Sequence, residues 1–158
     1  MTVSGVDSYD KRILKNIQED GTLGPSDLSP LVYLSPSQCS RRLQRLKAEK
    51  YIDRTVVLLN PEKLNLNVSA YIMIKLRSHA REDYTKFRDR MMELPEVVSC
   101  ESVTGDADYI LRVVAGDLAS YNRFLTNKLH AAGEIHTATS SIVLQQLKWT
   151  TSLALDYC

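Results

Sequence analysis

The chain has 158 residues, which is enough for one medium-sized domain or two small ones. Hydrophobic residues make up 44% and charged residues 25%, which is the balance of a soluble globular protein. No apolar run reaches the ~18 residues that a membrane span needs, and the first residues lack a signal-peptide pattern. The formal net charge of +1 excludes a chain that is basic throughout. We therefore expect a cytoplasmic protein with no membrane partner.

Cysteine and histidine are too dispersed to predict a disulfide framework or a metal site. The cysteines are odd in number and widely spaced, without a C-x-x-C pair, which indicates free thiols in a reducing compartment. The histidines have no metal-ligand spacing to them, so we expect neither a metal nor another cofactor. No nucleophile motif is present, which favours a binding protein over an enzyme.

The N-terminal third predicts three short helices. The first runs over residues 8–20, with an apolar face built around Ile13 and Ile17, and Gly21 is expected to end it in the left-handed conformation. The second begins after Gly24, and Pro30 in its interior should keep it short or distorted.

The third predicted helix follows directly after the turn Leu34-Ser35. Three short helices with a brief turn before the last one are the helix-turn-helix layout. Ser35 is a good N-cap, Pro36 suits the first helical position, and Gln38 completes an S-x-x-Q capping box. The segment predicts a sharply defined helix start.

This third helix has one apolar and one polar face. At about 100° per residue, Cys39, Leu43 and Leu46 share one side. Arginine and glutamine dominate the other side, and these residue types suit guanine edges, adenine edges and phosphates. An ordinary solvated helix with a cationic side would show the same pattern. The predicted DNA-binding residues are Ser35, Ser37, Gln38, Arg41, Arg42, Gln44 and Arg45.

The distribution of charge favours the DNA interpretation. Residues 35–54 hold six Lys/Arg against two Asp/Glu, a local net charge of +4 in a chain that is nearly neutral overall. Such a concentration is typical of a localised nucleic-acid footprint. Arg41 lies near the centre of the polar face and is the best candidate for a base contact, whereas Arg42 and Lys47 should contact phosphates or neighbouring helices.

After the helices, the hydrophobic period changes. Residues 52–59 predict an extended strand rich in Val and Leu, as a wing or an inter-domain strand. We assign residues 1–60 to a helix-turn-helix domain with its following strand, residues 61–67 to a hinge rich in turn formers, and residues 68–158 to a second domain.

The second domain predicts the order βαββαβ, a ferredoxin-like arrangement. Its strands are expected at 68–77, 97–103, 109–114 and 135–147, and its helices at 81–94 and 118–130. Helices on one face of a four-stranded sheet leave the other face without cover, so we expect subunits to pair through it. The chain as a whole is predicted to be α+β.

The loop between the two central predicted strands has two interpretations. Gly105 would let the backbone expose N–H groups to a carboxylate, and Asp106 or Asp108 could hold an ammonium. A free amino acid needs both kinds of partner. Glycine and aspartate are equally common in simple hairpin turns, so the residues alone leave both interpretations open.

The whole chain resembles the Lrp/AsnC family of leucine-responsive, or feast/famine, transcription regulators. Asp10-x-x-Ile13-Leu14 resembles the opening of the family, and Leu34-Ser35 with Arg42-Leu43-x-x-Leu46 resembles its recognition helix. Val103-Thr104-Gly105-Asp106-x-Asp108-Tyr109 resembles the hairpin of its effector domain, and Ile142-Val143-Leu144 with Lys148 resembles its closing strand.

This resemblance implies a winged helix-turn-helix domain followed by a ferredoxin-like domain that assembles dimers into octamers and often binds an amino acid. Ser140 stands where the family usually has Thr, so it keeps a hydroxyl. The predicted effector-binding residues are Thr104, Gly105, Asp106, Asp108 and Ser140.

We therefore predict a transcriptional regulator that binds double-stranded DNA, forms a homo-oligomer and responds to an amino acid or a related metabolite. An octameric protein that organises DNA without an effector is the alternative. A third hypothesis is an enzyme of amino-acid metabolism built on the ferredoxin-like half. The predicted helix-turn-helix argues against it.

Overall fold

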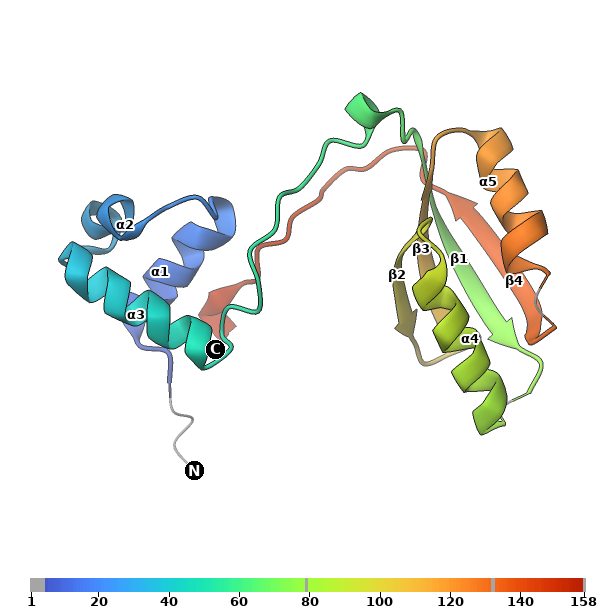
Figure 1. The fold of residues 1–158 in the computed structure, drawn as a ribbon, viewed down its shortest axis with the longest axis horizontal. Coiled ribbons are helices and arrows are strands. Elements are labelled where there is room, and N and C mark those ends of the chain that lie inside the picture. Colours follow the sequence, from blue (N-terminus) through green and yellow to red (C-terminus); the bar gives the residue numbers. More distant parts are fainter. Residues whose placement is uncertain (1–4, 79, 132, 158) are drawn as a thin grey trace. The chain divides into compact units, whose positions relative to one another are not determined.

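A computed structural model describes residues 5–78, 80–131 and 133–157 of the chain (Figure 1). The chain divides into two compact units, one formed by Met1–Leu58 with Lys148–Cys158 and the other by Leu59–Leu147. The sequence-based boundaries placed the last eleven residues in the second domain, whereas here they belong to the N-terminal unit. Among the described residues, no helix has the length and apolar character needed to cross a membrane.

The first helix, α1, spans Ser8–Glu19 and so ends one residue before the predicted range of 8–20. Asp7 caps it, because its carboxylate accepts hydrogen bonds from the backbone N–H groups of Tyr9 and Asp10. The helix ends at Asp20 with φ −139°, an extended conformation, and Gly21 does not adopt positive φ. The predicted left-handed glycine cap is therefore wrong. A backbone N–H of Asp20 bonded to the Asn16 carbonyl closes the helix instead.

The second helix, α2, spans only Pro25–Val32 and contains Pro30, in line with the predicted short element. It ends at Tyr33, which has φ 59° in the left-handed region although it is not glycine. This strained position lets the chain turn within two residues into the next helix. The Ser29 hydroxyl supports the turn by donating to the Leu34 carbonyl at 2.6 Å.

The third helix, α3, spans Pro36–Ala48 and packs with α1 and α2 around a small apolar core. Fully buried side chains come from all three helices. They are Ile13, Leu28, Val32, Cys39 and Leu46. Leu43 and Ile52 pack partly buried against them. The face of α3 opposite this core is left for solvent.

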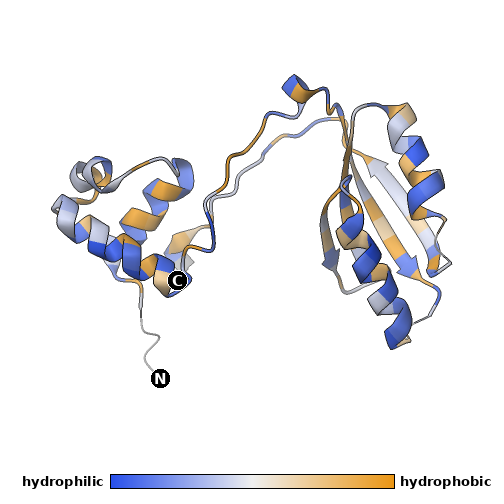
Figure 2. Cartoon of the chain, in the orientation of Figure 1, coloured by the Kyte–Doolittle hydropathy of each residue, from blue (hydrophilic) through white to orange (hydrophobic). Residues whose placement is uncertain are grey.

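The predicted strand at 52–59 does not form. Residues 53–60 carry no strand pairing, and Val56, Val57, Leu58 and Leu59 are all more than half exposed. The segment is apolar, as Figure 2 shows, but no neighbouring strand in the described chain receives its backbone groups. A pattern of Val and Leu predicts an extended backbone, whereas a strand also needs a partner.

The second unit contains a four-stranded antiparallel sheet in the order β2-β3-β1-β4. The strands are β1 (Val68–Leu76), β2 (Val97–Ser102), β3 (Tyr109–Ala115) and β4 (Ile135–Ile142). β1 pairs with both β3 and β4, so it lies between them. The last strand is shorter than predicted and ends at Ile142. The Val143 backbone N–H still donates to the Ser69 carbonyl at 2.9 Å, but residues 144–147 lie outside the sheet.

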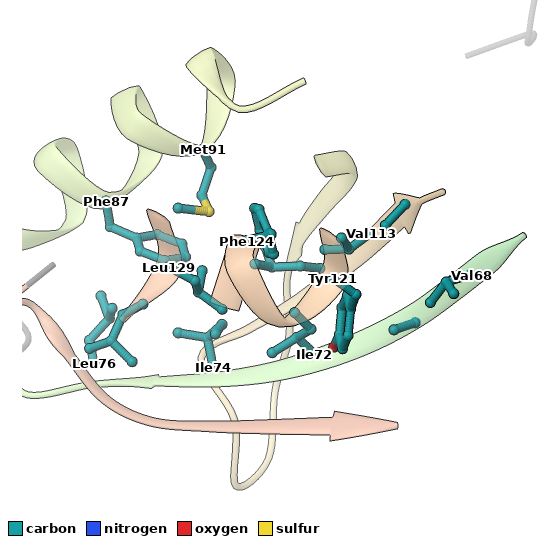
Figure 3. Close-up of a cluster of buried hydrophobic side chains, with 14 residues drawn as sticks. Val68, Ile72, Ile74, Leu76, Phe87, Met91, Val113, Tyr121, Phe124 and Leu129 are labelled. Carbon is teal, nitrogen blue, oxygen red and sulfur yellow. The ribbon is translucent and has the colours of Figure 1, made fainter. Parts of the chain in front are cut away.

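Two helices cover one face of the sheet, and the element order is the predicted βαββαβ. They are α4 (Arg81–Glu93) and α5 (Leu118–Phe124), which continues as a π-helical turn at Leu125–Leu129. Figure 3 shows side chains of both helices lying over those of β1 and β3. Because strand side chains alternate, β1 buries Ile72 and Ile74 here and turns Tyr71 and Met73 to the opposite, open face.

Candidate functional site

The start of α3 is held by its own polar side chains. The Ser35 hydroxyl accepts the Gln38 backbone N–H at 3.3 Å, and the side-chain Oε1 of Gln38 accepts the Ser35 backbone N–H at 3.0 Å. Ser37 lies 3.0 Å from Ser35, oxygen to oxygen. The predicted capping box is therefore confirmed. The side-chain oxygen of Gln38 is therefore engaged within the helix start.

Arg41 and Gln44 offer the least encumbered polar groups of this helix. Both side chains are exposed, and neither hydrogen-bonds to a residue that the structure describes. They lie one turn apart along the helix. A guanidinium and an amide presented in this way can contact base edges or phosphates without breaking an intramolecular bond.

Unlike the side chain of Arg41, those of Arg42 and Arg45 are bound to carboxylates. Arg42 Nη1 donates to Asp7 Oδ2 and to Asp10 Oδ1, each at 2.7 Å, while Arg45 Nη2 donates to Asp10 Oδ2. Asp10 is fully buried beneath them. The sequence analysis predicted that Arg42 would contact phosphates or a neighbouring helix. In the structure its guanidinium contacts the start of α1. The sequence analysis did not predict that Arg45 would also be bound to α1, through Asp10.

The same contacts shift the pKa values of this cluster. Hydrogen bonds to Asp10 and Asp7 raise the pKa of Arg42, so its charge is firmly retained. For Asp7, slight burial opposes ionisation, but hydrogen bonds from Asp10 and Arg42 outweigh it and lower the pKa below 3.8. Two of the six positive charges near α3 are thus paired with carboxylates at the start of α1, those of its N-cap Asp7 and of Asp10.

The predicted effector loop is the hairpin between β2 and β3. Its neck is closed by the Val103 backbone N–H, which donates to the Asp108 carbonyl at 3.1 Å. Gly105 has φ +118°, a conformation that side chains disfavour, so glycine is needed there although the space around it is open. Thr104 and Asp106 are exposed with it at the tip.

The two aspartates of the hairpin differ in role. Asp108 is half-buried, and its Oδ2 accepts the Leu76 backbone N–H at 2.7 Å, which ties the hairpin to the end of β1. Asp106 is exposed at the tip. The sequence analysis named both carboxylates as ammonium partners; in the structure one is engaged with β1 and the other is exposed.

Ser140 lies apart from the hairpin within one protomer. It stands opposite Ile72 in the β1–β4 pairing and receives a hydrogen bond from the Tyr121 hydroxyl at 2.9 Å. β1 separates its strand from β3, which carries the hairpin. The structure therefore does not join Ser140 to Asp106 in a single chain.

A shallow groove of about 330 Å³ beside the hairpin was missed by the sequence analysis. It is lined by Arg81, Tyr84, Thr85, Arg88 and Tyr109. Burial, with Tyr84 adding a smaller effect, raises the pKa of Tyr109, which keeps its hydroxyl protonated. The helical spacing of Arg81, Tyr84 and Arg88 was a signal that could have predicted this cationic side of α4.

Two family models match the chain and together cover both units. Residues 69–153 match the Lrp/AsnC ligand binding domain, and residues 6–53 match a winged helix-turn-helix DNA-binding domain. The first match alone spans more than half of the chain. The chain belongs to the Lrp/AsnC family. It is a DNA-binding transcriptional regulator of that type.

Individual Lrp/AsnC proteins support this assignment. The DNA-binding transcriptional activator DecR of Escherichia coli K12 is 33% identical over 151 residues, covering 96% of this chain and 99% of the activator. The Bkd operon transcriptional regulator of Pseudomonas aeruginosa is 36% identical and covers 90% of this chain and 93% of its own.

A solved structure of a Neisseria meningitidis transcriptional regulator in complex with L-methionine superposes with a TM-score of 0.94. Its sequence identity is 36%, with 97% of this chain and 99% of that chain covered. An AsnC family regulator from Agrobacterium tumefaciens has a TM-score of 0.91 at 40% identity, covering 96% and 99%. The predicted fold, α+β with a winged helix-turn-helix and a ferredoxin-like half, is therefore confirmed.

Proposed function

We propose that this regulator reads a DNA sequence with the polar face of α3 and adjusts its binding in response to an amino acid held at the β2–β3 hairpin. The observation that carries the first part is the exposed pair Arg41 and Gln44 on a helix whose start is fully capped. A rigid helix with unengaged donors can enter the major groove and contact base edges. Such a protein acts in the cytoplasm.

The effector proposal rests on the chemistry of the hairpin. An amino-acid carboxylate needs N–H donors, which the open backbone at Gly105 offers, and its ammonium needs a carboxylate such as Asp106. Thr104 could add a hydroxyl from the same loop, and Ser140 one from a second protomer. The Neisseria regulator was crystallised with L-methionine, so methionine is the first effector to test.

We further propose that the protein is a homo-oligomer, built from dimers that assemble into octamers. Tyr71 and Met73 are each 42% exposed on the sheet face opposite to the one that α4 and α5 cover. Large apolar side chains on an open sheet face favour pairing with a second copy. A ligand bound near such an interface could favour one assembly over another and so link metabolite level to DNA binding.

Two experiments test the two parts, DNA recognition and the response to an amino acid. A random-sequence duplex library is selected with the purified protein, and thermal unfolding is measured with each of the twenty amino acids. We expect an enriched DNA sequence and a higher melting temperature with methionine or a similar amino acid, because ligand binding stabilises the folded state by mass action. Arg41→Ala should weaken the enriched site by ~1–3 kcal/mol.

The alternative function predicts another result. A protein that organises DNA without an effector would bind duplexes regardless of sequence, and no amino acid would raise its melting temperature. Equal affinity of the wild-type protein and Arg41→Ala for the enriched duplex would contradict the proposed orientation of α3.

A further inference from the structure

The first helix presents a buried carboxylate to the recognition helix. Asp10 has no solvent exposure, and both of its oxygens accept hydrogen bonds. Oδ1 receives Arg42 Nη1, and Oδ2 receives Arg45 Nη2 together with the backbone N–H of Asp7 at 3.1 Å. A buried carboxylate is retained only when it is paired in this way.

The two arginines that it holds are not equivalent. Arg42 is bound by Asp7 as well as Asp10, its guanidinium carbon lies 5.4 Å from the Tyr9 ring centre, and its side chain is only 20% exposed. Arg45 is bound through one nitrogen and is 41% exposed. Within the described part of the chain, its other N–H donors meet no acceptor. The guanidinium of Arg42 is therefore used within the fold, whereas that of Arg45 is bound on one edge and exposed on the other.

Holding one side of a guanidinium determines where the other side points. A free arginine has many rotamers and loses them when it binds, whereas a planar guanidinium fixed in advance loses fewer. Two coplanar N–H donors suit the O6 and N7 acceptors of guanine. Fixing an arginine side chain before it binds should therefore increase its discrimination between bases more than it increases affinity for DNA of any sequence.

We propose that Asp10 is a positioning residue for DNA recognition: it fixes the guanidinium of Arg45 so that its open donors read a guanine edge. This inference rests on the proposed DNA-binding surface of α3 and adds a residue on another helix to it. Asp10 also neutralises charge at the interface. Removing its carboxylate releases positive charge toward DNA while it frees the orientation of Arg45.

Those two consequences act in opposite directions. Asp10→Asn keeps the size of the side chain, so affinity for random-sequence duplex should stay equal or become tighter. Relative to that affinity for random duplex, the affinity of Asp10→Asn for the duplex enriched by the wild-type protein should fall. We expect the ratio of specific to non-specific affinity to decrease about tenfold, the order of one well-placed bidentate contact. Competition binding at fixed salt measures both affinities, with circular dichroism as the check on folding.

Two variants test whether Asp10 acts through Arg45. In an Arg45→Ala background, Asp10→Asn should change the ratio no further, because the two residues form one unit. Asp7→Asn is the matched control, since Asp7 contacts Arg42 and not Arg45, and it should leave the ratio within about twofold of the wild-type value. If Asp10→Asn weakens specific and random duplexes equally, Asp10 has only a structural role and the proposal is wrong.

A further variant covers the case in which Asp10→Asn does not fold. Arg45→Lys keeps the charge but lacks the planar fork, so it should lower the ratio with little effect on random duplex. An unchanged ratio for Arg45→Lys would overturn the proposal. A wild-type protein that enriches no sequence contradicts the proposed DNA-binding surface itself, and this inference falls with it.

Discussion

Asp108 Oδ2 accepts the backbone N–H of Leu76 at 2.7 Å, so the carboxylate of the hairpin binds the neighbouring strand. Asp106, two residues earlier, is exposed at the tip of the same loop. One aspartate therefore supports the loop and the other is available to a ligand. Replacing each aspartate by asparagine should therefore have a different effect.

Asp106→Asn should weaken methionine binding about tenfold without changing the melting temperature, because it removes a charge partner of the ammonium. Asp108→Asn should lower the melting temperature, because a charge-assisted hydrogen bond to the Leu76 N–H becomes a weaker neutral one. Calorimetry and thermal unfolding measure the two effects. Equal methionine affinity in wild type and Asp106→Asn would mean that the loop is only a turn.

The open face of the sheet predicts a mass above that of the 17.9 kDa protomer in light scattering. Met73→Lys should shift the protein toward smaller species, because it places a charge at the centre of the proposed contact. Met92→Lys is the control, since Met92 is 83% exposed on α4. A monomeric wild-type protein, or equal masses for both variants, would contradict pairing through this face.

Arg90 joins α4 to the end of the π-helical turn and should matter for stability. Its Nη1 donates to the carbonyls of Lys128 and Leu129 at 3.2 and 3.4 Å, and its Nη2 lies 3.3 Å from Glu134 Oε1. Arg90→Ala should destabilise the second unit by about 1–3 kcal/mol, because it leaves the partly buried Glu134 without its cation.

Urea unfolding of the full chain measures this loss, and Arg88→Ala is the matched control on the same helix. The Arg88 side chain is 68% exposed, so its removal should change stability by less than about 0.5 kcal/mol. Equal losses for Arg88→Ala and Arg90→Ala would refute a special role for Arg90.

The stability of the N-terminal unit should depend on acid through Asp7. Its folded-state pKa lies below the ordinary 3.8, since hydrogen bonds from Asp10 and Arg42 overcome the effect of burial. The contribution is therefore complete well above pH 3.8 and is lost as the pH falls through the lowered value. Thermal unfolding between pH 6 and about pH 2–3 should show a difference between wild type and Asp7→Asn that shrinks at low pH. Asp53→Asn, at a side chain 86% exposed, should show no such trend.

The C-terminal residues are tied to α1 by a reciprocal pair of hydrogen bonds. The Leu153 N–H donates to Gln18 Oε1 at 2.7 Å, and Gln18 Nε2 donates to the Leu153 carbonyl at 3.3 Å. Gln18→Ala should speed amide exchange at Leu153 about two- to tenfold. Gln44→Ala, on the exposed face of α3, should leave that exchange rate unchanged.

Local features of the chain predict most of its elements. The N-cap at Ser35, the proline at the first position of α2 and the alternation in Val68–Leu76 act over a few residues, so the sequence alone predicts them. The polar face of α3 follows from the same kind of local periodicity. The order of motifs along the chain then indicates the family.

Other features needed the tertiary structure, because they join residues distant in sequence. The capping role of Asp7 is local, but the pairing of Asp10 with Arg42 and Arg45 crosses more than thirty positions and depends on how α1 meets α3. Only the packed helices show which arginines are paired with carboxylates and which stay exposed. Likewise, the Val and Leu of residues 53–60 predict an extended backbone, but whether it becomes a strand depends on a partner that local sequence cannot supply.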